Sequence, residues 1–330
     1  MAALMVTVEK AILETYISGG ASDANSFVLS FSAADFGTPA HAGDISSDST
    51  KPVELDWRSL TSAQKKQLQF QASVSLPGMS LSGLGSLGLV GKTMTRLRSL
   101  DLQGNALTLQ HAVDILQQLP QLQTLDLGKN RLEGQVPSTV LFTGSKLHTL
   151  ALNASAVQPA TAGALVAHLP ALRHLHVCAN EWSDVQPFVT AAGSEVAVTQ
   201  LFLGGNPIDS LSKCLSSLST WGKLEHIDLA GTAFASSVSE SDMASCSPPA
   251  SLSSLGLDEC NLASWAEVAA VGVLPLPSVR LRRTAVLQPV VQEFNSAQAA
   301  AGAGAAGVCD VRGGARGLYM PRAQACGEQS

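Results

Sequence analysis

The chain has 330 residues with a formal net charge of −6, and only 14% of the residues are charged. A nucleic-acid partner requires a basic surface that displaces counterions from phosphates, so this composition argues against one. The six cysteines are scattered without a CxxC motif, which is typical of reduced thiols in a cytoplasmic protein.

The N-terminal region is predicted to lead into a repeat domain. Residues 1–20 should form a short amphipathic helix. They do not resemble a secretory signal, because their apolar run is interrupted early by Glu9 and Lys10. The stretch 21–55 is rich in Ser, Ala, Gly and Asp and predicts a linker. Residues 56–70 predict a helix that caps the first coil. We expect a cytoplasmic, cytoskeleton-associated protein without a membrane partner.

A leucine-rich motif recurs along most of the chain. It reads LRSLDLQGNAL at 97–107, LQTLDLGKNRL at 122–132 and VTQLFLGGNPI at 198–208. The LxL core alternates, so it predicts a short strand with one buried face. The expected strand centres recur every 24 to 28 residues, which is typical of a leucine-rich-repeat solenoid. These centres are Val74, Leu100, Leu125, Leu150, Leu175, Leu201, Ile227, Leu255 and Val279.

Each strand centre is followed five residues later by a turn position that is usually Asn in this repeat, here called the Asn position. A buried Asn can satisfy backbone groups of adjacent coils through its amide. Asn105, Asn130, Asn180 and Asn206 occupy this position. The smaller residues Ser155, Thr232, Cys260 and Thr284 replace Asn in the other coils.

Helical spacing follows several strands, at 111–120, 162–170 and 265–275, and proline ends each segment. The sequence therefore predicts an α/β leucine-rich-repeat solenoid over residues 56–287. It should have about nine coils, with a curved parallel sheet inside and short helices outside. The insertion 235–250 is predicted as a polar loop, and the Ala/Gly-rich tail 288–330 is predicted to be disordered.

Four motifs that resemble known functional signatures have simpler explanations. Gly83, Gly85 and Gly88 spell GxGxxG, but a repeat strand follows where a dinucleotide fold needs a helix. The overlapping SLGLVGKT at 86–93 has Ser86 where a P-loop needs glycine. The string NRLEGQVP at 130–137 resembles receptor-type repeats in one coil only. We therefore expect no enzyme activity and no cofactor.

The fourth motif is the alternation of His174, His176 and Cys178, which should place three possible metal ligands on one side of a strand. No fourth ligand is specified. We favour a solvated contact surface over a zinc site, so no metal is expected here.

The concave face of the curved sheet is the expected binding surface. Phe202 is the aromatic residue predicted to be exposed there and could anchor a partner. Ordinary solvated strand residues remain an equal alternative, because solenoids also bind through loops or their outer side. The candidate partner-binding residues are Asp101, Asp126, His174, His176, Phe202, His226, Asp228, Asp258, Arg280 and Arg282. Their charges grade from acidic in the early coils to basic in the last.

Several short motifs resemble the tubulin-specific chaperone E (tubulin-folding cofactor E) and cofactor E-like family. They are AILETY at 11–16, KPVE at 51–54, VSLPGMSLSGLG at 74–85, NLASWAEV at 261–268 and PSVRLRRTAVLQP at 277–289. The GKNDG-type motif and the ubiquitin-like domain of larger members have no counterpart here. The resemblance therefore assigns no tubulin-contacting residue.

This resemblance implies a non-enzymatic, chaperone-like protein that acts in α-tubulin folding, tubulin complex assembly or heterodimer turnover. The expected partners are α-tubulin or the tubulin heterodimer and other tubulin-folding cofactors. The alternative is a generic leucine-rich-repeat adaptor, such as a ciliary or signalling scaffold. A nucleotide-dependent enzyme built on residues 83–93 is a third hypothesis.

Overall fold

The computed structural model describes residues 28–30, 53–54, 72–78, 80–83, 95–137, 142, 144–284 and 318–319. Two compact units, residues 1–176 and 177–330, are treated in turn. The predicted helix at 1–20, the predicted capping helix at 56–70, and glycines 85 and 88 lie outside the described residues.

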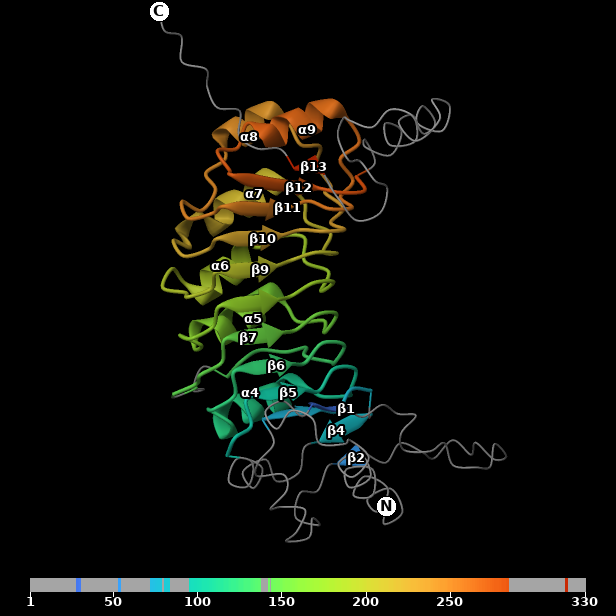
Figure 1. Ribbon diagram of the computed structural model, residues 1–330, viewed down its shortest axis with the longest axis vertical. Coiled ribbons are helices and arrows are strands. Elements are labelled where there is room, and N and C mark those ends of the chain that lie inside the picture. The colour runs from blue at the N-terminus through green and yellow to red at the C-terminus, as the bar shows by residue number, and fades with distance from the viewer. Residues whose placement is uncertain are drawn as a thin grey trace, which may run out of the picture. The chain divides into compact units, whose positions relative to one another are not determined.

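The first unit contains a ladder of parallel strands (Figure 1). The helices α4 (Leu109–Gln118) and α5 (Pro159–Ala167) connect successive strands. A separate pair joins β2 (Val53–Glu54) to β4 (Leu81–Gly83). The ladder consists, in order, of β1 (Val28–Ser30), β3 (Ser73–Ser75), β5 (Ser99–Asp101), β6 (Thr124–Asp126), β7 (Thr149–Ala151) and β8 (His174–His176).

The second unit repeats the arrangement with parallel strands β9 (Gln200–Phe202), β10 (His226–Asp228), β11 (Ser254–Gly256) and β12 (Ser278–Leu281). The strand β13 (Leu318–Tyr319) pairs antiparallel with β12. The helical segments are α6 (Gln186–Ala192), α7 (Leu211–Ser217), the 3-10 turn η2 (Leu218–Thr220), α8 (Glu240–Ser245) and α9 (Trp265–Gly272).

The predicted strand centres are confirmed. All nine lie in parallel strands, and the paired centres within each unit are in direct register, as in Leu100↔Leu125 and Ile227↔Leu255. Every centre is at most 7% exposed, whereas most flanking residues are half-buried. The buried centres and the apolar sides of the helices, such as Ile115, form the core.

Two ladder ends differ from the expected organisation. The predicted linker 21–55 contains β1, which pairs with β3, and β2, which pairs with β4. The predicted disordered tail 288–330 contains β13 on the edge of β12. The strands β1 and β13 pair with backbone N–H and C=O groups that would otherwise be unpaired at the two edges. The amino-acid composition of these segments does not reveal this pairing.

The insertion 235–250 contains a helix, so the prediction of a polar loop was wrong. Ser239 caps α8 by accepting a hydrogen bond from the Asp242 amide at 3.2 Å. Glu240 and Asp242 lie in the first turn, where carboxylates stabilise a helix. Met243 anchors the helix in the core at 2% exposure.

The residue before each Asn position is in the left-handed backbone region in every described coil. The φ angles at these positions run from 50° to 69°. Some coils use glycine, as at Gly104, whereas others place an ordinary side chain there, as at Lys129 and Ala154. A non-glycine residue with this φ costs about 1–2 kcal/mol, so the turn geometry is imposed by the stacking of coils.

This strain leads to a prediction for two alanines in the same coil. Ala154→Gly should stabilise the first unit by about 0.5–1 kcal/mol, because glycine adopts positive φ without a steric penalty. Ala151→Gly is the matched control, since Ala151 lies in β7 and has no positive φ. The control should destabilise by about 0.5–1 kcal/mol. Urea unfolding of both variants gives the two signs.

Candidate protein-binding surface

The predicted binding residues lie on the strand faces of the two units. Within the first unit, Asp101, Asp126, His174 and His176 lie on β5, β6 and β8. Within the second unit, Phe202, His226, Asp228 and Arg280 lie on β9, β10 and β12, and Asp258 and Arg282 follow β11 and β12. Arg282 is exposed and the others are half-buried.

The two carboxylates of the first unit lie side by side on registered strands, because Asp101 pairs with Asp126. Asp101 accepts hydrogen bonds from the Gln103 amide at 3.0 Å and from the Ser75 hydroxyl at 2.6 Å. Asp126 accepts one from the Gly128 amide at 2.8 Å. Burial raises the pKa of Asp126, and the neighbouring Asp101 charge adds to this shift. These bonds fix the carboxylates in place on the strand face.

His174 and His176 flank the buried centre of β8 on its strand face. His174 Nδ1 lies 3.3 Å from the Thr149 hydroxyl. Burial lowers the pKa of His176, with a further contribution from His174, so the His176 ring is neutral at pH 7. Burial raises the pKa of the Cys178 thiol. Across the described residues, no group of three His, Cys, Asp or Glu side chains is placed to hold a metal ion.

The predicted aromatic anchor is partly covered. Phe202 contacts His226 edge-on, with 5.6 Å between the ring centroids. Burial lowers the pKa of His226, and the Arg280 charge lowers it further. Phe202 and His226 therefore form one half-buried aromatic surface instead of a single exposed ring.

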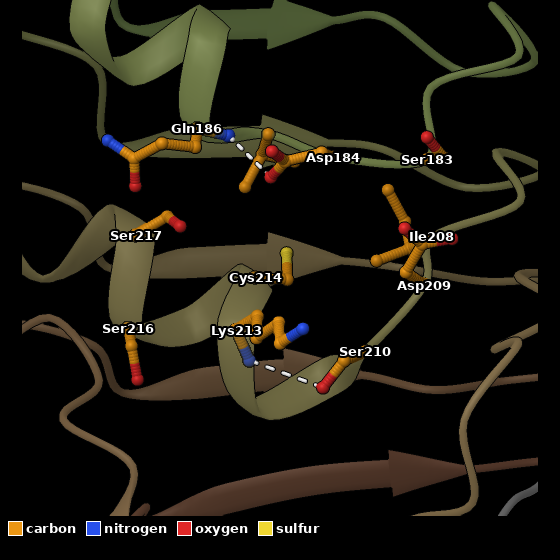
Figure 2. A pocket seen from close by; sticks show the side chains of 11 residues that line it. Ser183, Asp184, Gln186, Ile208, Asp209, Ser210, Lys213, Cys214, Ser216 and Ser217 are labelled. Carbon is orange, nitrogen blue, oxygen red and sulfur yellow. Dashed lines mark hydrogen bonds between the residues drawn. The ribbon is translucent and has the colours of Figure 1, made fainter.

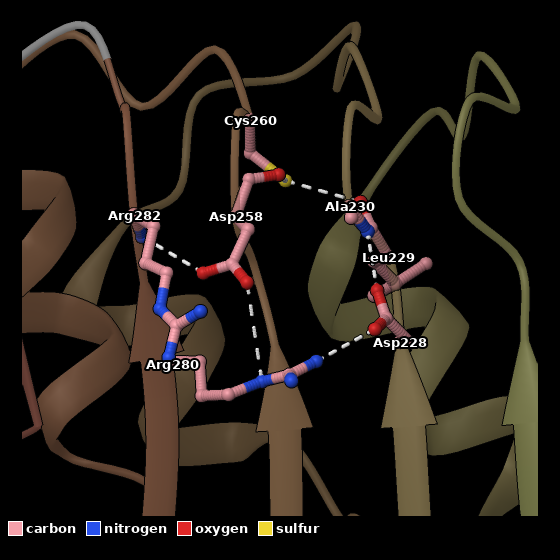
Figure 3. Close-up of polar contacts among 7 residues, drawn as sticks. All are labelled: Asp228, Leu229, Ala230, Asp258, Cys260, Arg280 and Arg282. Atoms are coloured by element: carbon pink, nitrogen blue, oxygen red, sulfur yellow. Dashed lines mark hydrogen bonds and ion pairs between the residues drawn. The ribbon is translucent and has the colours of Figure 1, made fainter. Parts of the chain in front are cut away.

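Arg280, a basic residue of the last coil, contacts acidic residues of the same unit. Arg280 Nη2 lies 2.6 Å from Asp228 Oδ2, and Arg280 Nε lies 4.0 Å from Asp258 Oδ2 (Figure 3). The Arg282 amide donates to Asp258 Oδ1 at 2.8 Å. The expected gradient from acidic to basic coils is therefore weakened, because the charge of Arg280 is paired mainly with Asp228.

Glycine on β11 makes room for this ion pair. Asp228, Gly256 and Arg280 are direct register partners on three adjacent strands. A Cβ atom at Gly256 would lie 2.8 Å from Arg280 Nη2 and 3.1 Å from Asp228 Cγ. The guanidinium reaches Asp228 only because no side chain stands between them.

We expect Gly256→Ala to displace the guanidinium and weaken the contact between Arg280 and Asp228. The Arg280 side chain is 35% exposed, so the loss should be about 0.5–1 kcal/mol. The same substitution in an Arg280→Met background should cost less, because the contact is already gone and only the close approach to Asp228 remains. Urea unfolding of the four proteins in this double-mutant cycle measures the coupling. Equal costs in both backgrounds would show that Gly256 does not serve the ion pair.

A cavity of about 430 Å³ lies beside α6 and α7 in the second unit (Figure 2). Cys214 lines it, and burial raises the pKa of this thiol to about 12. A thiol that stays protonated at neutral pH is a poor nucleophile. The other lining residues are Ser183, Asp184, Val185, Gln186, Ile208, Asp209, Ser210, Lys213, Ser216 and Ser217.

Registered parallel strands, buried asparagines and helices between successive strands define an α/β leucine-rich-repeat solenoid fold. The Leucine Rich Repeat family profile matches residues 121–141. An internalin from Listeria monocytogenes has a similar solved structure, with 14% identity and a TM-score of 0.40, covering 71% of this chain and 67% of the internalin chain. Comparison with curated proteins gives no match. No helix in the described ranges is long and apolar enough to cross a membrane.

Proposed function

We propose that this chain is a non-catalytic protein that binds another protein through its strand faces. The observation that carries the proposal is the ordered row of Asp101 and Asp126, whose carboxylates are held by hydrogen bonds from Ser75, Gln103 and Gly128. Prearranged polar groups lower the entropic cost of binding. The acidic pair in the first unit and the aromatic pair Phe202 and His226 in the second are the two contact patches.

The proposed partner is α-tubulin or the tubulin heterodimer, together with other tubulin-folding cofactors, in the cytoplasm and at the cytoskeleton. The support is the sequence resemblance at 74–85, 261–268 and 277–289. In the second of these segments, Asn261 donates to the Phe234 carbonyl and accepts from the Phe234 amide, both at 2.9 Å. Glu267 closes the capping box of α9 with Ser264. Both residues therefore have structural roles that are compatible with a shared fold.

A pull-down with purified tubulin tests this proposal, with a full-length tubulin-folding cofactor E as the positive control. We expect the chain to retain tubulin and Asp101→Asn/Asp126→Asn to retain at least about fivefold less, since the removed charges are central to the patch. Glu195→Gln, an exposed carboxylate away from the strands, is the control. If the cofactor retains tubulin and this chain does not, the tubulin assignment is wrong.

The alternative is a general adaptor with a different partner. The half-buried pair of Phe202 and His226 favours it, because an aromatic surface of this kind accommodates many protein ligands. Cross-linking in cells from residue 200, on the same strand β9 as Phe202, followed by identification of the attached protein, separates the two functions. A tubulin-free set of partners that is lost with Phe202→Ala would support the adaptor.

A further inference from the structure

The helix α9 exposes an apolar face that faces solvent. Trp265 is 52% exposed and Val273, which follows the last turn, is 43% exposed; they are the exposed large hydrophobic residues of the described chain. Ala269 and Gly272 are also exposed and lie between them, four and seven residues after Trp265. This spacing places the residues along one side of a helix. The face has a large side chain at each end and small residues in the centre.

The chain segment that contains α8 and α9 is acidic. Residues 235–276 contain no Lys, Arg or His. Two of the acidic residues in this stretch, Asp258 and Glu259, pair with Arg280 and Arg283. The acidic residues left for a partner are Glu240, Asp242 and Glu267, which lie in the first turns of α8 and α9.

Hydrogen bonds connect the N-terminal ends of α8 and α9, which carry these acidic residues. The Val238 amide, just before α8, donates to Glu267 Oε1 at 3.3 Å. Glu267 Oε2 accepts from the amides of Ala263 at 2.7 Å and Ser264 at 3.0 Å. Burial raises the pKa of Glu267, but these hydrogen bonds outweigh it, so the pKa is lowered and the carboxylate stays charged. The negative charge of Glu267 is therefore fixed at the N-terminal end of α9.

A cavity of about 220 Å³ lies next to the N-terminal end of α9. Glu267 and Asn261 line it together with the segment Phe234–Val238. Trp265 does not line this cavity, so a basic partner residue has two separate places to bind: the cavity beside Glu267 and the exposed indole ring of Trp265. Cations also bind favourably to the face of a tryptophan ring.

We propose that the α9 face, from Trp265 to Val273, binds an amphipathic helical segment of a partner protein that carries lysine or arginine among its apolar residues. Apolar side chains of the segment pack on Ala269, Gly272 and Val273, where the small residues allow close approach. Its basic side chains lie at the acidic ends of α8 and α9. This surface lies on α9 and is separate from the strand faces, so it can bind a second protein.

A defined peptide tests this surface on the full chain. The probe is a labelled peptide of about 18 residues with leucines at helical spacing and lysines between them. The same peptide with glutamates in place of the lysines is its control. We expect the basic peptide to bind at least about tenfold more tightly than the acidic one by fluorescence anisotropy, and binding to weaken with added salt.

Substitutions then locate the binding. Trp265→Ala should weaken the basic peptide at least about tenfold, as expected for a central tryptophan, whereas Trp265→Phe should recover most of the loss. Glu240→Gln/Asp242→Asn should weaken it about threefold or more. Glu133→Gln and Glu195→Gln, which remove exposed carboxylates outside residues 235–276, should have no effect. Circular dichroism confirms that each variant is folded.

Three results would overturn the proposal. The first is equal binding of the basic and acidic peptides. The second is binding that survives Trp265→Ala or that is lost with Glu133→Gln or Glu195→Gln. The third is a dimer, seen by sedimentation, that Trp265→Ala converts to a monomer, because the occupant would then be a second copy of the chain. None of these measurements uses tubulin, so their failure is distinct from failure of the proposed function.

Discussion

Phe188→Ala is expected to destabilise the second unit by about 3–5 kcal/mol. Phe188 on α6 is completely buried. Its ring lies 5.2 Å from the ring of Trp182 and 5.1 Å from that of Trp221, measured between centroids. Truncation removes both aromatic contacts and leaves a cavity between two large, rigid side chains that cannot collapse into it.

Urea unfolding followed by tryptophan fluorescence measures this loss, because Trp182 and Trp221 report directly on the site. Phe188→Leu is the control, since it keeps most of the volume, and should cost about 1–1.5 kcal/mol. Trp221 Nε1 donates to the Gly193 carbonyl at 3.0 Å, so its ring should stay in place in both variants. A loss below about 1 kcal/mol for Phe188→Ala would mean that the cluster can repack.

The strand positions could be predicted because each coil repeats the same two structural positions. A buried centre such as Leu125 and a turn residue such as Asn130 recur at fixed separation. The helices α4, α5 and α9 were also predictable from their apolar spacing. Short helices carry too few turns for such a pattern, so α6, α7 and α8 were missed. In α8 the capping residue Ser239, followed by Glu240 and Asp242, was the available signal.

The binding surface was predictable in outline only. Alternation placed Asp228 and Arg280 on the strand face, but not their ion pair, which depends on strand register and on the missing side chain at Gly256. Nor could the turn conformation of Ala154 be predicted, because only glycine signals positive φ in a sequence. The exposure of Trp265 was also missed, since an aromatic residue in a helix pattern normally indicates core.

The second prediction with a large expected effect concerns the Asn position. Substitutions at this position in two neighbouring coils should change the free energy of unfolding in opposite directions. Asn206 is 1% exposed. It accepts hydrogen bonds from the amides of Asn180 at 2.8 Å and Trp182 at 3.1 Å. It donates to the carbonyls of Val177 at 3.0 Å and Leu203 at 2.6 Å. Asn206→Ala removes all four bonds and should cost about 2–4 kcal/mol in urea unfolding.

Thr232 occupies the same position in the next coil and is also 1% exposed. Its hydroxyl has no hydrogen-bond partner among the described residues. Thr232→Val keeps the shape and removes a buried polar atom, so it should leave stability unchanged or raise it by up to about 1 kcal/mol. If both substitutions cost the same, the position would be stabilised by side-chain volume rather than by hydrogen bonds. Opposite signs would show that the asparagine amide, where present, links the coils of this solenoid, and that the chain tolerates its loss in the coil of Thr232.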